Sequence, residues 1–200
     1  MPPASRFRSQ FDDSKAKPGG DGEPGFTVVA KRLQNWFRKS ARDLPWRGRY
    51  DPWQVWVSEI MAQQTRIEVV VEYFDGFIAR FPDVRSLAAA TVDEVLAAWS
   101  GLGYYRRARL LHAGAGNVVE RFGGEIPSEP DLLRSIPGIG RYTAGAIASI
   151  AFGKPAPIVD GNVSRLLGRL YLIDLAPGSA REEIEWRIAS SLVQVAESPG

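Results

Sequence analysis

The 200-residue chain contains no cysteine and a single histidine, His112. Without cysteine it can form no disulfide, and it has no thiol nucleophile and no thiolate ligand for zinc or an iron–sulfur cluster. One histidine excludes a histidine-based metal site and leaves only that residue for a serine–histidine triad. We therefore predict no metal site, and we expect any catalysis to depend on carboxylates, hydroxyls, amides, lysines or arginines.

The chain also lacks a long apolar run and a strong charge of either sign. No stretch approaches the length of a membrane span, and the first residues have no apolar signal-peptide core. We therefore expect a soluble, cytoplasmic protein that does not bind membranes. The net charge is only +2, but a pI near 9.0 is typical of a protein that meets a polyanion through local basic patches.

Helical periodicity dominates the sequence after a polar beginning. Residues 1–26 are rich in proline, glycine and alternating charge, so we predict a disordered tail there. From Thr27 onward no stretch alternates strongly enough to predict a strand, and the predicted class is all-α. The expected helices are one from about residue 27, then 52–65, 67–81, 91–99, 106–122, a short one around 132–133, 141–152, 160–171 and one from 179.

The segment Ile136-Pro-Gly-Ile-Gly-Arg-Tyr-Thr143 predicts a helix end, a hairpin and a new helix from Arg141. Gly138 and Gly140 can take backbone angles closed to other residues. The first amides of the new helix have no helical acceptor and lie at the positive end of its dipole, which favours phosphate. We predict that this segment binds the DNA backbone through Pro137, Gly138, Ile139, Gly140, Arg141 and Thr143. Taken alone, Pro-Gly-x-Gly is also an ordinary helix connection.

Two carboxylates are candidates for chemistry. Asp160 precedes the helix expected at 160–171, where the alternative role is that of an N-cap. Glu59 is placed among Trp56, Ile60 and Met61, where burial would raise its pKa and keep its proton available. The alternative for Glu59 is a solvated glutamate on an amphipathic helix.

An amide pair follows Glu59 on the same expected helix. Gln63 would share a face with Glu59 at the i, i+4 spacing. Gln63 and Gln64 are uncharged amides that can hydrogen-bond base edges, so we predict that both contact DNA.

Five collinear segments resemble the helix-hairpin-helix DNA glycosylase superfamily, and within it adenine DNA glycosylases of the MutY type. They are Leu44-Pro-Trp-Arg47, Ser58-Glu-Ile-Met-Ala-Gln-Gln-Thr65, Gly101-Leu-Gly-Tyr-Tyr105, Pro137-Gly-Ile-Gly140 and Val159-Asp-Gly-Asn-Val163. The resemblance covers about residues 44–169. It implies two helical subdomains with the active site between them. Residues 44–157 would form a helical barrel with the hairpin, and residues 27–43 and 158–200 a second module, incomplete at its C-terminus.

The resemblance implies a monofunctional enzyme that flips adenine out of a mispair with 8-oxoguanine or guanine and hydrolyses its glycosidic bond. Protonated Glu59 would deliver a proton to the base, and ionised Asp160 would stabilise the cationic sugar. By the same resemblance Tyr142 and Asn162 accompany these carboxylates, Gln64 and Tyr104 wedge into the base stack, and Trp46 and Arg47 line the adenine pocket. The expected partner is mispaired duplex DNA, bound by a monomer associated with the nucleoid.

Family members usually continue into an iron–sulfur segment and a lesion-reading domain. This sequence has no cysteine for a cluster, so we expect no cofactor within the chain, and a truncated chain that turns over poorly by itself.

Two alternatives stay open. An endonuclease III-type glycosylase/lyase for oxidised pyrimidines needs a lysine after the hairpin's Gly-x-Gly-Arg, where this chain has Tyr142. A non-enzymatic helix-hairpin-helix module would explain the hairpin but neither carboxylate.

Overall fold

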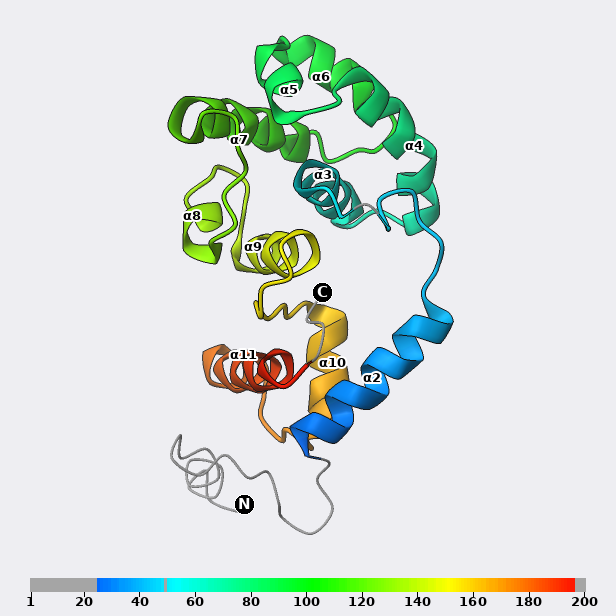
Figure 1. Cartoon of the computed structure of the whole chain (residues 1–200), viewed down its shortest axis with the longest axis vertical. Helices are drawn as coiled ribbons and strands as arrows, with labels where there is room; N and C mark the ends of the chain where they lie inside the picture. The colour runs from blue at the N-terminus through cyan, green and yellow to red at the C-terminus, as the bar shows by residue number, and fades with distance from the viewer. Residues whose placement is uncertain (1–24, 49, 197–200) are drawn as a thin grey trace. The chain divides into compact units, whose positions relative to one another are not determined.

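The computed structural model describes residues 25–48 and 50–196, and within these ranges the regular structure is entirely helical (Figure 1). The predicted all-α class is confirmed. Most of the predicted tail, residues 1–24, lies outside the described residues, while Phe26 already begins the first described helix. None of the described helices is long and apolar enough to cross a membrane.

The chain divides into two compact units, each of which we describe by itself. Among the described residues, unit 1 joins residues 25–40 with residues 159–196, and unit 2 comprises residues 41–48 and 50–158. Unit 1 contains α2 (Phe26–Ser40), α10 (Gly161–Leu170) and α11 (Ser179–Gln194). Unit 2 contains α3 (Pro52–Ala62), α4 (Ile67–Arg80), α5 (Val84–Ala89), α6 (Val92–Ala98), α7 (Arg106–Phe122), α8 (Pro130–Arg134) and α9 (Arg141–Ala146), which continues into a π-helical turn, Ile147–Ala151.

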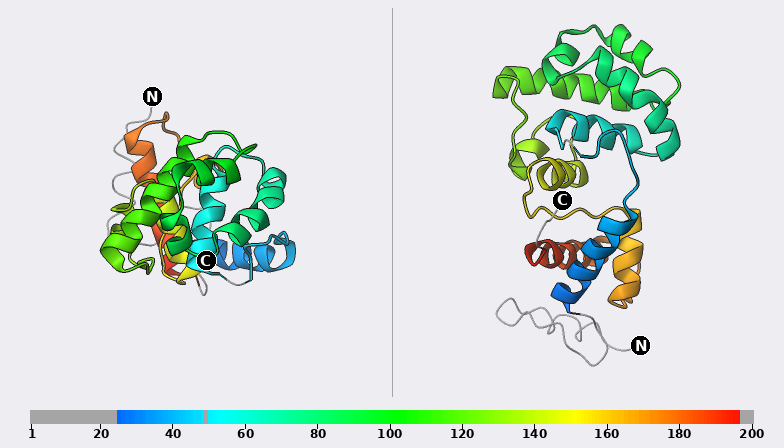
Figure 2. Two further views of the ribbon diagram at one scale, coloured as in Figure 1. Left: turned by 90° about the horizontal axis from the view of Figure 1, so that it is seen from above. Right: turned by 45° about the vertical axis from the view of Figure 1, so that its right-hand side comes forward.

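Helix α3 is the centre of unit 2. It packs against α4, α7, α9 and the π-helical turn, and Figures 1 and 2 show it between α7 and α9. Its sequence explains this position, because a helix that is apolar on nearly all sides must be buried on nearly all sides. Asp51 caps its start by accepting a hydrogen bond from the Gln54 amide at 2.9 Å, and Pro52 occupies the first turn.

Unit 1 has its own smaller core. Helices α2 and α10 both pack against α11, around a cluster of buried residues. The cluster comprises Val29, Leu167, Tyr171, Ile173, Ile188 and Ala189.

Two predicted helix ends are wrong by several residues, and one helix was missed. Helix α3 ends at Ala62 rather than Thr65, and the helix after the hairpin stops being α-helical at Ala146, where the π-helical turn begins. The sequence analysis missed α5, which has only six residues. The missed signal was Asp83, whose carboxylate accepts from the Ser86 amide at 2.7 Å in a capping box.

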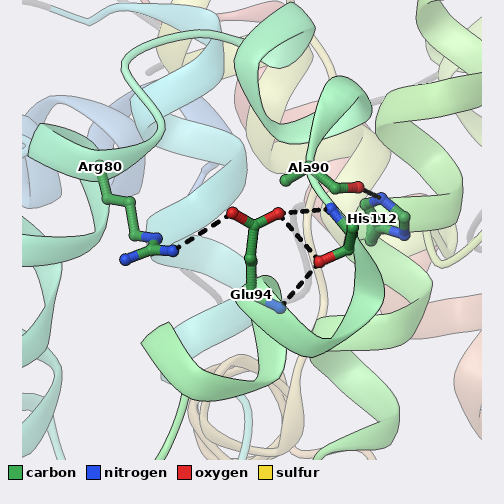
Figure 3. A network of polar contacts seen from close by, with 5 residues as sticks. Arg80, Ala90, Glu94 and His112 are labelled. Atoms are coloured by element: carbon green, nitrogen blue, oxygen red, sulfur yellow. Dashed lines mark hydrogen bonds and ion pairs between the residues drawn. The ribbon is translucent and has the colours of Figure 1, made fainter.

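A capping box begins α6 (Figure 3). The Thr91 amide donates to the Glu94 carboxylate at 2.8 Å, and the Glu94 amide donates to the Thr91 hydroxyl at 3.3 Å. Arg80 of α4 lies 3.6 Å from the same carboxylate, and His112 of α7 donates to the Ala90 carbonyl oxygen at 2.9 Å. The chain's only histidine therefore ties α7 to the connection that precedes α6.

This network makes the stability of unit 2 depend on pH. Hydrogen bonds from the Thr91 amide and hydroxyl hold the pKa of Glu94 below its ordinary value, and Arg80 acts in the same direction. A lowered carboxyl pKa means that the contribution to stability is complete above the ordinary pKa and is lost as pH falls through the folded-state pKa.

We expect Glu94→Gln to lower the free energy of unfolding at neutral pH, and the difference from the unmodified chain to shrink below about pH 4.3. Urea unfolding of both proteins at a series of pH values measures this difference in the free energy of unfolding. Thr91→Val, which removes one of the donors to Glu94, should show a weaker form of the same pH dependence. A difference that does not change with pH would contradict a role for the Glu94 charge.

Candidate DNA interface and carboxylates

The hairpin packs tightly on α7 because two glycines leave room for it. A Cβ on Gly114 of α7 would lie 2.8 Å from the Pro137 carbonyl oxygen and 2.9 Å from the Trp56 ring. Gly138 has φ +83°, and a Cβ there would lie 2.9 Å from the Leu110 Cβ. The hairpin's position in unit 2 therefore depends on small residues on both sides of the contact.

Both hairpin glycines can take backbone angles closed to other residues, but only Gly138 does so, and Gly140 differs. Its φ is −86°, which any residue can adopt, and a Cβ would meet no atom within 4 Å. Gly140 precedes α9 and offers it no side-chain cap. No contact within the chain therefore requires glycine at this position, and the predicted contact of Gly140 with the DNA backbone stays a prediction.

Two of the predicted DNA-binding side chains in this segment are buried. Ile139 is 5% exposed and Thr143 is 3% exposed, so their side chains cannot reach DNA. Pro137, Gly140 and Arg141 are exposed. The sequence pattern identified the segment correctly as a hairpin, but it did not separate its core-facing from its outward-facing side chains.

The amide pair lies beyond the end of α3, not on it. Gln63 is the C-cap, so it does not share a helical face with Glu59 as predicted. Gln64 is exposed and has φ +56°, a left-handed conformation that is uncommon for residues other than glycine. The turn therefore aims Gln64 away from the core.

The loop Gly101–Tyr105 presents a second unusual residue. Tyr104 has φ +47° and is 62% exposed. Gln63, Gln64 and Tyr104, with Tyr105, Arg106, Arg107 and Leu110, line one surface pocket of about 680 Å³. The structure thus brings together the residues predicted to wedge into the base stack, although they come from segments far apart in the sequence.

Glu59 and Tyr142 belong to two helices that pack against each other, α3 and α9. Trp56, Ile60 and Met61 are buried as predicted, whereas Glu59 itself is half-buried, as is Tyr142. Each makes polar or ring contacts in the folded chain. The raised pKa expected for Glu59 stays a prediction.

Trp46 and Arg47 lie in the segment that leads into α3. The Trp46 ring packs on Phe74, with 5.0 Å between ring centroids, and is half-buried. Arg47 donates to the Arg42 carbonyl oxygen at 2.8 Å and lines a pocket of about 640 Å³ together with Asp43, Gln54 and Asp75. Their predicted place in an adenine pocket stays a prediction.

Asp160, in unit 1, is the N-cap of α10. Its carboxylate accepts hydrogen bonds from the Val163 amide at 2.7 Å, the Asn162 amide at 2.9 Å and the Asn162 side-chain amide at 2.9 Å. Arg165 in turn donates to the Asn162 side chain. The helix start and these donors all favour the negative charge of Asp160. The sequence analysis missed Arg165, although its spacing of three residues from Asn162 is a usable signal on a helix.

The buried carboxylate of Glu185 in α11 links this helix to α10. Glu185 is 4% exposed, accepts from the Arg181 guanidinium at 2.7 Å and accepts from the Ser164 hydroxyl at 2.7 Å. Ser164 lies one turn after Asp160, so this contact orients the helix that carries Asp160.

The model of the HhH-GPD superfamily base excision DNA repair proteins matches residues 57–190, well over half of the chain. The chain belongs to this superfamily. The match begins within α3 and ends within α11, so it includes Glu59, the hairpin and Asp160.

Individual HhH-GPD relatives agree with this assignment. The human adenine DNA glycosylase is 44% identical over 184 residues, covering 87% of this chain and 34% of its own. A thymine/uracil-DNA glycosylase of Pyrobaculum aerophilum is 36% identical, covering 84% of this chain and 74% of its own. A solved thermostable thymine-DNA glycosylase superposes with a TM-score of 0.74 at 26% identity, covering 84% of this chain and 77% of that one. The chain therefore spans about a third of the length of its human relative.

The iron–sulfur cluster found in members of this superfamily does not fit this chain. The cluster is held by cysteine thiolates, and the 200 residues include no cysteine. Among the described residues, no group of histidines, aspartates and glutamates has the arrangement of a metal site.

The two hairpin glycines provide a matched pair of substitutions. Gly138→Ala should lower the free energy of unfolding by about 2 kcal/mol, because it combines a left-handed backbone with a clash against Leu110. Gly140→Ala should be neutral or stabilise by about 0.5 kcal/mol, because its conformation suits alanine. Urea unfolding measures both.

If the hairpin meets the DNA backbone, the stable Gly140→Ala variant should bind matched and mispaired duplexes more weakly by the same factor. A loss confined to the mispaired duplex would mean that the hairpin reads the lesion.

Proposed function

We propose that the chain is a monofunctional adenine DNA glycosylase that removes adenine mispaired with 8-oxoguanine or guanine. The observation that carries this proposal is the 44% identity, over most of the chain, to a protein named for that activity. The carboxylates support it, because removal of a base from a sugar calls for one acid that donates a proton and one that stays ionised. The expected partner is duplex DNA, bound by a monomer at the nucleoid.

In this mechanism the bond between the sugar C1′ and adenine breaks, and its electron pair leaves with the base. Glu59 donates the proton that neutralises the departing adenine. The Asp160 carboxylate stabilises the positive charge that develops on the sugar. Water then adds at C1′, and the proton that it releases balances the one that Glu59 donated.

The surroundings of Asp160 suit its proposed role. Three hydrogen bonds from Asn162 and Val163 orient the carboxylate before the substrate arrives. Arg165 holds Asn162 and so supports the same arrangement indirectly.

A second candidate is release of thymine or uracil. It is favoured by the relative from Pyrobaculum aerophilum, because the alignment covers 74% of that protein, more than of the human adenine enzyme. We prefer adenine because the identity to the adenine enzyme is higher.

The assay that tests the proposal uses duplexes with a single A:8-oxoG, A:G, T:G or oxidised-pyrimidine pair, and the chain in excess over DNA. We expect release of adenine from the first two. Release of thymine alone would establish the second candidate, cleavage of the oxidised-pyrimidine strand would indicate the endonuclease III type, and binding without base release would indicate a DNA-binding module.

Asp160→Asn should keep DNA binding and reduce adenine release by about a hundredfold or more, because it removes the charge opposite the sugar cation. The fold should persist, since asparagine caps helices as well as aspartate does. Asp83→Asn, at the N-cap of α5, is the matched control and should release adenine at the unmodified rate. Near-normal single-turnover release by Asp160→Asn would contradict the role of Asp160.

Tyr142 separates the proposed activity from a lyase. A tyrosine hydroxyl cannot form an imine with the sugar, so the unmodified chain should leave the abasic strand uncut and should not be trapped by borohydride. Tyr142→Lys should give inefficient strand cleavage and a trapped covalent adduct, whereas Tyr142→Phe should give neither. Trapping of the unmodified chain at a comparable level would show that a lysine already reaches the sugar.

A further inference from the structure

Arg107, the second residue of α7, is the most buried charged side chain of unit 2 among those described. It is 8% exposed, and burial lowers the pKa of its guanidinium while the neighbouring Tyr104 raises it. No carboxylate contributes to that balance, and the described ion pairs do not include Arg107. A buried cation without an anionic partner is costly unless hydrogen bonds replace its hydration.

Main-chain carbonyl oxygens replace that hydration at the two terminal nitrogens, while Nε is buried without a hydrogen-bond partner. Nη1 donates to Met61 at 2.8 Å, to Ile60 at 3.0 Å and to Gln63. Nη2 donates to Leu102 at 3.1 Å and to Gly103 at 3.3 Å. One guanidinium therefore caps the C-terminal end of α3 and at the same time holds the loop that precedes α7.

Each clamped segment leads directly into a residue with a left-handed backbone. Gln64 follows the clamped carbonyl of Gln63, and Tyr104 follows that of Gly103; their φ values are +56° and +47°. Such conformations persist in residues other than glycine only where the surroundings enforce them. The hydrogen bonds of Arg107 to the residues just before Gln64 and Tyr104 thus connect it to both strained residues.

The aromatic neighbours of Arg107 complete the support. The guanidinium carbon lies 5.4 Å from the Tyr104 ring centroid and 5.5 Å from that of Trp99. The Trp99 ring nitrogen donates to the Gly103 carbonyl oxygen at 3.1 Å, the same oxygen that Arg107 holds. The main chain before Tyr104 is therefore held by hydrogen bonds to Gly103, and the Arg107 guanidinium lies against the Tyr104 ring. Tyr104 itself stays 62% exposed.

We infer that Arg107 is a positioning residue that holds Gln64 and Tyr104 together as a preformed platform for an unstacked base step of duplex DNA. The inference rests on the proposed function. Arg107 does not touch the DNA itself; it sets the backbone from which the two exposed side chains project. Lysine cannot replace it, because a single ammonium has no planar fork with which to span two segments.

The decisive variant is Arg107→Lys, with Arg109→Lys as the matched control. Arg109 is exposed on the same helix, so its substitution keeps the charge and leaves the clamp intact. The probe is a duplex with 2-aminopurine beside an A:8-oxoG mispair, whose fluorescence rises when the base unstacks. We expect Arg107→Lys to reduce the rise and to weaken mispair binding by about tenfold, with matched-duplex binding nearly unchanged. The control should behave as the unmodified chain.

A double-mutant cycle distinguishes positioning from a general loss of stability. If Arg107 acts through the platform, then Arg107→Lys should cost less than about twofold in a Tyr104→Ala background. An equal tenfold loss in both backgrounds would overturn the inference. If Arg107→Lys does not fold, Trp99→Phe replaces it. This change removes the bond to Gly103 and shortens the ring beside the guanidinium, so it should cause a smaller loss in the same direction. An unchanged response would overturn the inference.

Amide hydrogen exchange tests the clamp without DNA. Exchange in residues 63–66 and 101–105 should rise together in Arg107→Lys and stay unchanged in Arg109→Lys. Unchanged exchange in both segments would overturn the clamp. An unmodified chain that shows this protection but no fluorescence response to the mispair would count against the proposed function instead.

Discussion

Trp56 meets Gly114 where α3 crosses α7, and the carbonyl oxygen of Pro137 lies against the same glycine. The Trp56 side chain is fully buried there, so neither helix can shift without opening a cavity or forcing a clash. Because α7 also begins directly after the loop that carries Tyr104, the hairpin and this loop are both placed relative to one helix. The spacing between the candidate DNA-facing elements of unit 2 is thus determined by a contact in its core.

Much of the fold is local enough to be predicted from the sequence. The box Thr91–Glu94 and the cap Asp160 mark helix starts through hydrogen bonds that span three residues or fewer. The end of α3 could not be predicted in this way, because the residues after Ala62 are compatible with a helix. The helix ends where Arg107, which lies far along the chain, takes up its last carbonyl groups.

The candidate site likewise has features that could be predicted from local sequence and features that depend on distant contacts. Residue types and spacing pointed to the hairpin, to Asp160 and to the Gln63–Gln64 pair. Asn162 and Tyr104 came only from the resemblance to the glycosylase family, and the structure places them beside Asp160 and in one pocket with Gln64. Spacing could not indicate that Ile139 and Thr143 face the core, or that only Gly138 of the two glycines is conformationally required. Those properties depend on contacts with α7, such as that of Gly138 with Leu110, and the sequence of the hairpin alone does not reveal such contacts.

The cap at the start of α10 also bears on how this protein can change over time. Catalytic groups commonly lower the stability of the fold that holds them, so that a substitution that raises stability often lowers activity. At Asp160 the main-chain amides of the first turn of α10, which the carboxylate caps, are the same groups that favour its negative charge. Replacement of Asp160 by a residue that cannot cap a helix therefore lowers the stability of the fold, in addition to any effect on activity. Asparagine caps helices as well as aspartate does, so it would not lower the stability in this way. Selection for stability alone would keep the position restricted to a few capping residues, even in a lineage where the reaction is no longer needed.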